Sequence, residues 1–165
     1  MDGRRVSESR ITFTQPMGLD MANVLGNVHG GIIMKICDEA GAFAAMKHAR
    51  RPVVTVSVDS MSFHSAVNIG NLLTVEAEVT WVGRSSMETR ILVTAEDLMS
   101  ATVTHTNTAF FVYVALDDAG RPTHAPPLIL ETDDERRLFE EGAERQALRL
   151  ERRREERTLR PGGRR

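Results

Sequence analysis

The residues best suited to chemistry lie between Ala22 and Asp38, where a glycine- and amide-rich segment runs into a helix-like apolar stretch. At the start of a helix, the N–H groups of Gly30 and Gly31 lack partners within the helix and can bind an oxygen that gains negative charge. Asn23 can both donate and accept hydrogen bonds, which suits holding a water or a carbonyl. Asp38 places one carboxylate among small and apolar neighbours, where a charge is costly unless something uses it.

Each of these residues also has a purely structural interpretation. The glycines can form a flexible loop and a helix cap, and asparagine is common in turns. Asn27 can simply cap the helix. Asp38 can be an ordinary helix carboxylate paired with Lys35 or Lys47, and its neighbour Glu39 has the more solvent-like position. Taken one at a time, these residues leave both interpretations open.

A second polar group, Arg84-Ser85-Ser86, falls in a turn after a strand-like run that ends near Trp81. A guanidinium, two hydroxyls and turn amides together can hold a phosphate or hydrogen-bond an amide such as that of pantetheine. The alternative is a solvated hairpin tip. We treat this turn as a candidate binding site.

Several other kinds of site are not indicated. The five histidines have no metal-ligand spacing. The sequence contains no Gly-x-Ser-x-Gly nucleophile motif and no dinucleotide or phosphate-loop fingerprint. We therefore expect no metal and no cofactor.

Composition narrows the class of protein. A length of 165 residues suits one domain, and a net charge of −2 gives no reason to expect nucleic acid or an anionic membrane as partner. The single cysteine, Cys37, cannot form an internal disulfide and fits a reducing compartment. No signal-peptide layout and no bilayer-spanning apolar run is present. We expect a soluble cytoplasmic protein.

The pattern along the chain predicts an α+β fold. A long helix is expected from about His29 to His48, with Ile32, Ile36, Ala40, Phe43 and Ala44 on one face. Strands are expected at Arg10–Gln15, Val53–His64, Leu72–Val82, Met87–Glu96 and Ala101–Leu116. Short connections make the last strands antiparallel neighbours, and the wide apolar arc of the helix requires a sheet that wraps it. This single-domain arrangement is the hotdog fold.

A change in charge pattern divides the chain at residue 130. Residues 1–130 form the expected hotdog domain, and residues 131–165 are dominated by Glu and Arg. Opposite charges three or four apart favour a solvated helical extension, for example Glu140 and Glu144 with Arg145 and Arg149. Its thin apolar stripe consists of Leu138, Ala143, Ala147 and Leu150. The alternative is a helix docked on a neighbouring subunit.

The chain resembles a known family at several motifs in order. The first motifs that carry this resemblance are Ala22-Asn23-Val24, Gly26-Asn27-Val28-His29-Gly30-Gly31, Met34-Lys35 and Asp38-Glu39-Ala40. With them the chain resembles the acyl-CoA thioesterases of the hotdog superfamily, most of all brain-type and small bacterial acyl-CoA hydrolases. Further matching motifs are Val58-Asp59, Phe63-His64, Gly83-Arg84-Ser85-Ser86-Met87-Glu88, Ala109-Phe110-Phe111-Val112-Tyr113-Val114-Ala115-Leu116 and Gly120-Arg121-Pro122. The resemblance spans residues 10–130, and the charged tail looks like the family's C-terminal helix.

The resemblance implies hydrolysis of an acyl-CoA to a fatty acid and CoA. The family's catalytic asparagine and aspartate fall on Asn23 and Asp38, supplied by opposite subunits of a homodimer, and dimers of this family commonly assemble in threes. Gly31, or Gly30 as the near alternative, would polarise the thioester carbonyl, and Asp38 would activate water or attack directly. Arg84, Ser85 and Ser86 would bind the CoA moiety.

Two other functions compete with hydrolysis. A hotdog dehydratase needs a histidine beside an acid, and His29 near Asp38 is the candidate pair. A non-catalytic acyl-CoA-binding or regulatory hotdog protein would use the same pocket without turnover. The acyl chain length depends on a tunnel that we expect near Phe43, Met46, Met61 and Phe63, whose depth the sequence does not give.

Overall fold

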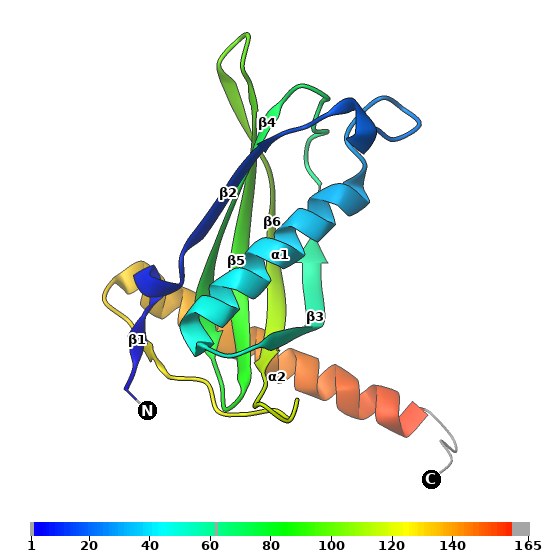
Figure 1. The fold of residues 1–165 in the computed structure, drawn as a ribbon. Helices are drawn as coiled ribbons and strands as arrows, with labels where there is room; N and C mark the ends of the chain where they lie inside the picture. The colour runs from blue at the N-terminus through cyan, green and yellow to red at the C-terminus, as the bar shows by residue number, and fades with distance from the viewer. Residues whose placement is uncertain (1, 62, 160–165) are drawn as a thin grey trace.

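A five-stranded antiparallel sheet organises the protein (Figure 1). The computed structural model describes residues 2–61 and 63–159. The strand order is β2-β4-β5-β6-β3, so β2 and β3 are the two edges. The strands are β2 (Ile11–Pro16), β3 (Val53–Met61), β4 (Leu72–Val82), β5 (Ser86–Asp97) and β6 (Thr102–Ala115).

The helix α1 (Gly30–Ala49) lies across one face of this sheet (Figure 1). Its N-terminus is capped by the His29 side chain, and its C-terminus by Arg50, which adopts the left-handed conformation and donates its N–H to Met46 O. The core between helix and sheet consists of small and branched side chains, including Ile33, Ile36, Cys37, Ala40, Ala44, Val75, Val79, Ile91 and Phe111. The predicted hotdog architecture is confirmed.

The prediction that Phe43 lies on the buried face of the helix is wrong. Phe43 is 48% exposed. It packs edge-on against Phe13 of the edge strand β2, at a ring-centroid distance of 5.8 Å. The buried positions of the helix include Cys37, Gly41 and Ala45 instead. Small residues at these positions bring the helix backbone close to the sheet.

The second helix, α2 (Asp133–Leu159), packs on the other face of the sheet (Figure 1). Its first half is not the solvated extension that the charge pattern predicted. Leu138 and Gly142 are buried, and a Cβ on Gly142 would lie 2.6 Å from Cβ of Trp81, so only glycine lets the helix come this close. The remaining members of the predicted apolar stripe, Ala143, Ala147 and Leu150, are exposed.

Buried ion pairs hold α2 in place. Glu88 of β5 is fully buried and binds Arg145 at 2.8 Å and Arg149 at 2.9 Å. Arg149 also binds Asp59 of β3 at 2.5 Å. The predicted pairing of these arginines with Glu140 and Glu144 is therefore wrong, since a carboxylate on the sheet takes their place.

Short elements complete the fold. β1 (Arg4–Arg5) pairs in parallel with β7 (Leu128–Ile129), and two 3₁₀ turns cover Val6–Ser9 and Leu19–Met21. The predicted strand that reached His64 ends at Met61, and Ser62 lies outside the described residues. In the described part of the chain, no helix is both long and apolar enough to cross a membrane.

Candidate active site

The carboxylate of Asp38 points from the middle of α1 toward the sheet. Its Oδ1 accepts a hydrogen bond from Thr55 Oγ1 of β3 at 2.8 Å and lies 3.1 Å from the Tyr113 hydroxyl of β6. The Tyr113 hydroxyl has one proton and shares it between Oδ1 and the main-chain oxygen of Asp38, which lies 2.9 Å away. Hydroxyl donors from two neighbouring strands thus hold one oxygen of this carboxylate.

The structural interpretation of Asp38 as a surface ion-pair partner is wrong. Lys35 pairs with Glu39 at 3.2 Å, and Lys47 donates to the main-chain oxygen of Arg10. No ion pair to Asp38 is formed within residues 2–61 and 63–159, and the side-chain donors that hold its carboxylate are two hydroxyl groups. A half-buried carboxylate without a counter-ion is the kind of group that acid–base and nucleophilic catalysis use.

The loop before α1 holds Asn23 in a turn of its own. Asn23 Oδ1 accepts from the N–H groups of Leu25 at 2.9 Å and Asn27 at 3.2 Å, so the side-chain oxygen is used within the loop. This leaves the Asn23 amide NH₂ as the part that can contact a ligand. Asn27 is not the helix cap, because His29 takes that position.

The two glycines at the start of α1 differ in their hydrogen bonds. The Gly31 N–H donates to Nδ1 of His29 at 2.9 Å, so the free amide expected at Gly31 is already occupied. Gly30 is the first residue of the helix, and its N–H points out of the helix without a bond to any described group. The structure therefore favours Gly30 over Gly31 as an amide open to a ligand.

A cavity of about 310 Å³ lies beside this loop. Asn23, Gly30 and Phe63 contribute to its wall, together with Asn27, Val28, Ile33, His64, Ser65, Ala66 and Val67. Asp38 does not line this cavity. Asp38 is eight positions after Gly30 in α1, a rise of about 12 Å along the helix axis.

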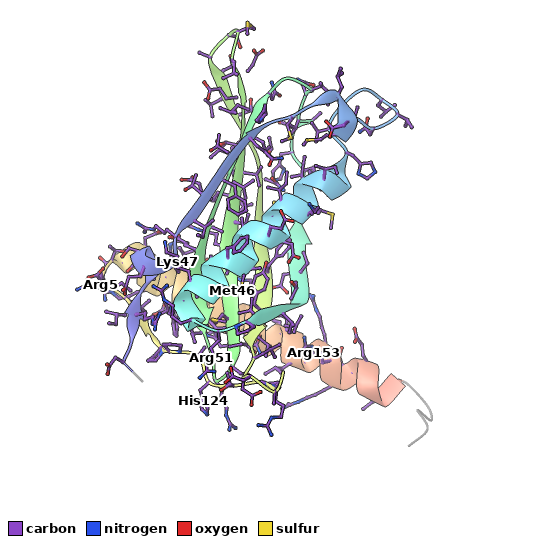
Figure 2. The ribbon with its side chains drawn as sticks, in the orientation of Figure 1. Arg5, Met46, Lys47, Arg51, His124 and Arg153 are labelled. Carbon is purple, nitrogen blue, oxygen red and sulfur yellow. The ribbon has the colours of Figure 1, made fainter. Side chains whose placement is uncertain are left out.

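The Arg84-Ser85-Ser86 turn joins β4 and β5 at the end of the sheet nearer to Asp38. In the sheet register Ser86 lies opposite Val114, the residue after Tyr113. The turn is packed by the segment after β6, since Arg84 O accepts from Ala125 N and Arg84 Nε donates to His124 Nε2. Figure 2 labels His124 and Arg51 at this end, and Figure 1 shows the loop that precedes α1 at the opposite end.

One chain therefore presents the predicted site residues as two separate groups. Asn23 and Gly30 lie around the cavity at the N-terminal end of α1. Asp38, Thr55 and Tyr113 lie farther along the helix, toward the Arg84 turn. The fold of a single chain does not bring the two groups together.

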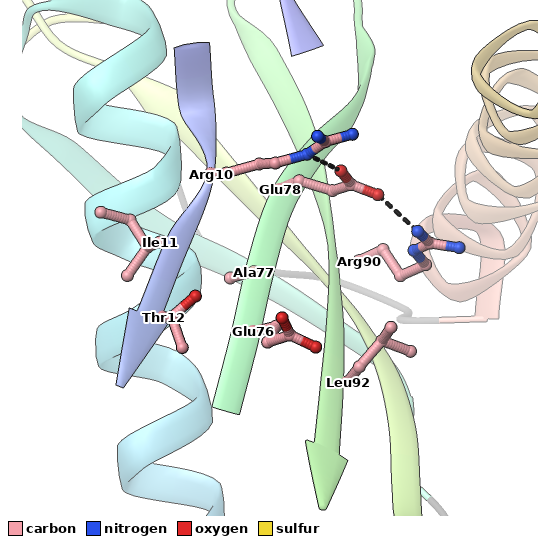
Figure 3. A pocket seen from close by; sticks show the side chains of 8 residues that line it. All are labelled: Arg10, Ile11, Thr12, Glu76, Ala77, Glu78, Arg90 and Leu92. Atoms are coloured by element: carbon pink, nitrogen blue, oxygen red, sulfur yellow. Dashed lines mark hydrogen bonds and ion pairs between the residues drawn. The ribbon is translucent and has the colours of Figure 1, made fainter. Parts of the chain in front are cut away.

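A different hollow, of about 280 Å³, lies on the outer face of the sheet (Figure 3). Its wall carries an ion-pair chain in which Glu78 binds Arg10 at 2.9 Å and Arg90 at 2.5 Å. None of the predicted site residues lines it. Two arginines share the one Glu78 carboxylate there, and the exposed Glu76 also lines the wall.

The structure gives no support for a cysteine nucleophile or a metal site in the described residues. Burial, with the nearby Asp38 charge, raises the pKa of Cys37 to about 12, so this thiol is not a nucleophile at neutral pH. Among the described residues, no group of three or more His, Cys, Asp or Glu side chains has an arrangement suited to a metal ion.

Sequence reasoning missed Thr55 and the role of Tyr113. Tyr113 is the chain's only tyrosine and falls on the inward face of an apolar strand. A buried tyrosine hydroxyl needs a hydrogen-bond partner, and the carboxylate on the facing helix is that partner. Thr55 carried no comparable signal, because threonine is common in strands.

Sequence comparison gives the family. Residues 25–102 match the thioesterase superfamily. A cytosolic acyl coenzyme A thioester hydrolase of Rattus norvegicus is 36% identical over 139 residues, which cover 83% of this chain and 36% of that protein. A Bacillus subtilis protein named as an uncharacterized acyl-CoA thioester hydrolase is 33% identical over 156 residues, covering 94% of this chain and 91% of its own length. This chain belongs to the thioesterase superfamily.

Solved structures agree with this membership. An acyl-CoA hydrolase of Staphylococcus aureus, in complex with butyryl-CoA, CoA and CoA disulfide, is 32% identical with a TM-score of 0.86, and 94% of each chain is covered. A hexameric acyl-CoA thioesterase is 35% identical with a TM-score of 0.87, covering 97% of this chain and all of the other. This chain spans only about a third of the length of the rat relative.

Proposed function

We propose that this thioesterase-superfamily protein hydrolyses acyl-CoA thioesters to a free acid and CoA. The observation that carries the proposal is the Asp38 carboxylate, held through Oδ1 by two hydroxyls and paired with no cation of the described chain. Such a group can take a proton from water or attack a thioester carbonyl. The two routes differ in one product, since single turnover in isotope-labelled water leaves label in Asp38 only if the carboxylate attacks.

The spacing of the candidate residues supports their roles. Alanine variants of an asparagine, an aspartate and a threonine have been solved for the S. aureus hydrolase. Their positions are 15 and 17 residues apart, the separations between Asn23, Asp38 and Thr55. We assign to these three residues the positions that were replaced in that enzyme.

We further propose that two chains complete each site. Asn23 and Gly30 of one subunit would face Asp38 of the other, with the Gly30 N–H polarising the thioester carbonyl. The edge strand β3 supports this interface, because it has a neighbour on one side only and exposes Val54, Val56 and Val58 by 39–43%. Met34 of α1 is similarly exposed.

For the assembly as a whole we propose a trimer of such dimers. The hexameric state of a 35% identical thioesterase supports this number. We place the CoA moiety at Arg84, Ser85 and Ser86, because their turn lies at the Asp38 end of the sheet. The guanidinium and hydroxyls suit phosphate and amide groups.

The competing functions have less support. For a dehydratase, His29 would have to act as acid or base, but its Nδ1 is taken by the Gly31 N–H, and within one chain it lies about two turns before Asp38. A non-catalytic acyl-CoA-binding protein would share the pocket and gives no reason for a carboxylate held by two donors. Turnover separates this alternative from hydrolysis.

The test is release of free CoA from a series of acyl-CoA chain lengths, followed with a thiol reagent. Asp38→Ala should lower kcat by about a hundredfold or more, since a positioned acid–base or nucleophilic group contributes at least that much. Glu39→Ala is the matched control, because this exposed carboxylate is the next residue of the same helix and should leave kcat unchanged. Equal, slow release by wild type and Asp38→Ala would contradict the proposal.

A further inference from the structure

We infer that Tyr113 is a positioning residue, whose hydroxyl acts with that of Thr55 to fix Oδ1 of Asp38 and so presents Oδ2 as the reacting oxygen. This inference rests on the proposed function, because it gives a direction to the carboxylate assigned there.

The two oxygens of Asp38 have different surroundings. Oδ1 lies 2.8 Å from Thr55 Oγ1 and 3.1 Å from the Tyr113 hydroxyl. Within residues 2–61 and 63–159, no group forms a hydrogen bond to Oδ2. The bond from Tyr113 to the main-chain oxygen of Asp38, at 2.9 Å, ties the same hydroxyl to the helix backbone. Donors on both strands therefore prevent the carboxylate from exchanging its oxygens by rotation.

Tyr113 is built as a rigid donor. The residue is fully buried, and its ring stacks on Phe111 at a centroid distance of 6.5 Å. Burial and the neighbouring Asp38 charge raise the pKa of Tyr113, so the hydroxyl keeps its proton at any physiological pH. It donates a hydrogen bond and takes no part as a base.

The helix makes room for this hydroxyl at Gly41. A Cβ at that position would overlap the Tyr113 hydroxyl and would lie 2.9 Å from Thr89 Oγ1. A glycine in the middle of a helix lowers helix stability, so its presence here is explained by the close approach of the tyrosine. Gly41 lies three residues after Asp38 and therefore on the same side of α1.

The fixed orientation of the carboxylate determines which of its oxygens reacts. Because Oδ1 is engaged by Thr55 and Tyr113, Oδ2 is the oxygen with both lone pairs free, either to take the proton of an attacking water or to form the bond to the acyl carbon as the C–S bond breaks. A carboxylate free to rotate would present either oxygen and would spend less time aligned. Alignment of this kind acts on kcat more than on substrate binding.

The test is a double-mutant cycle on steady-state kinetics. Tyr113→Phe and Thr55→Val should each lower kcat about tenfold with KM within about twofold, because one donor remains on Oδ1. The double variant should lose about a thousandfold, more than the hundredfold product, since no donor remains to hold the oxygen.

A control separates positioning from loss of a buried hydrogen bond. Ser9→Ala removes a fully buried hydroxyl that donates to Val6 O and accepts from Val79 N, with no hydrogen bond to Asp38, Thr55 or Tyr113. It should lower the melting temperature and leave kcat per folded protein unchanged. Tyr113→Phe with wild-type kcat, or a double variant that merely multiplies the single effects, would overturn the inference.

Asp38→Asn, measured in the same series, distinguishes a failure of the role proposed for Asp38 from a failure of the role inferred for Tyr113. If it keeps wild-type kcat, the proposed role of Asp38 is wrong and the inference is wrong with it. If it is inactive while Tyr113→Phe is fully active, the proposed function stands and the positioning role alone is wrong.

Discussion

Arg149 of α2 lies 2.9 Å from the fully buried carboxylate of Glu88 on β5. The same guanidinium binds Asp59 on the edge strand β3, so one side chain joins the outer helix to two strands of the sheet. β3 also carries Thr55, which holds Asp38 on the opposite face. The charged helix thus supports the strand that positions the candidate catalytic carboxylate.

Replacing Arg149 should be strongly destabilising. Arg149→Met leaves Glu88 buried with Arg145 as its remaining cation, and breaking a buried pair typically costs about 3 kcal/mol of unfolding free energy. Urea denaturation measures the loss. Arg152→Met, an exposed position on the same helix, should change the unfolding free energy by less than about 0.5 kcal/mol. Equal stabilities for the two variants would show that the ion pairs do not hold α2.

Gly142 should be intolerant of even one methyl group. Gly142→Ala favours the helix by propensity, but its Cβ would lie 2.6 Å from Cβ of Trp81. Overpacking of this kind costs about 1–3 kcal/mol, which exceeds the gain in propensity of about 1 kcal/mol. Thermal unfolding followed by circular dichroism should therefore show a lower melting temperature. A higher one would mean that α2 does not pack this closely on the sheet.

His48 should make stability fall in mild acid. Its Nε2 bonds Pro126 O at 2.7 Å, its buried Nδ1 has no partner among the described residues, and burial lowers the pKa of His48. The unfolded chain therefore binds a proton first, and unfolding free energy decreases as the pH falls below about 6.5. His48→Gln keeps a donor for Pro126 without titrating, so its stability should depend less on pH. The exposed His64→Gln should keep the wild-type slope, and identical slopes for all three proteins would refute this role of His48.

The Gly30 amide can be removed without removing the helix. Proline is tolerated at the first helical position, and His29 before it has φ −64° and ψ 125°, which a following proline accepts. Gly30→Pro should fold and should lower kcat about a hundredfold, the usual effect of losing one donor to a developing oxyanion. Gly30→Ala keeps the N–H and meets nothing nearer than Phe63 Cζ at 3.6 Å, so it should stay active. Full activity of Gly30→Pro would assign the carbonyl contact elsewhere.

The sequence predicted the sheet and α1 well for physical reasons that are local. In β4 the alternation of Val75, Ala77 and Val79 with polar residues predicted a strand with one buried face, and β4 has the predicted bounds. The glycine-rich segment before α1 marked the start of the helix to within one residue. Periodicity and capping are properties of neighbouring residues, so one sequence suffices to detect them.

What the sequence did not predict depends on partners far along the chain. Arg145 and Arg149 had acidic neighbours at helical spacing, but their buried partner is Glu88, about 60 residues earlier. Thr80 falls at a polar position of the alternating pattern in β4 but is only 2% exposed. The hydroxyls on Asp38 come from strands that follow it by 17 and 75 residues. Tertiary packing decides such contacts, and local pattern does not encode them.

The central claim, a site shared between two subunits, is tested most directly by mixing two inactive variants. Asn23→Ala and Asp38→Ala should each be inactive as pure proteins. After subunit exchange, a mixed dimer has one site with both replacements and one intact site, so a 1:1 mixture should regain about a quarter of wild-type kcat per chain. Native mass spectrometry with one mass-labelled variant verifies that exchange occurred. No recovery of CoA release in verified mixed dimers would contradict the shared site.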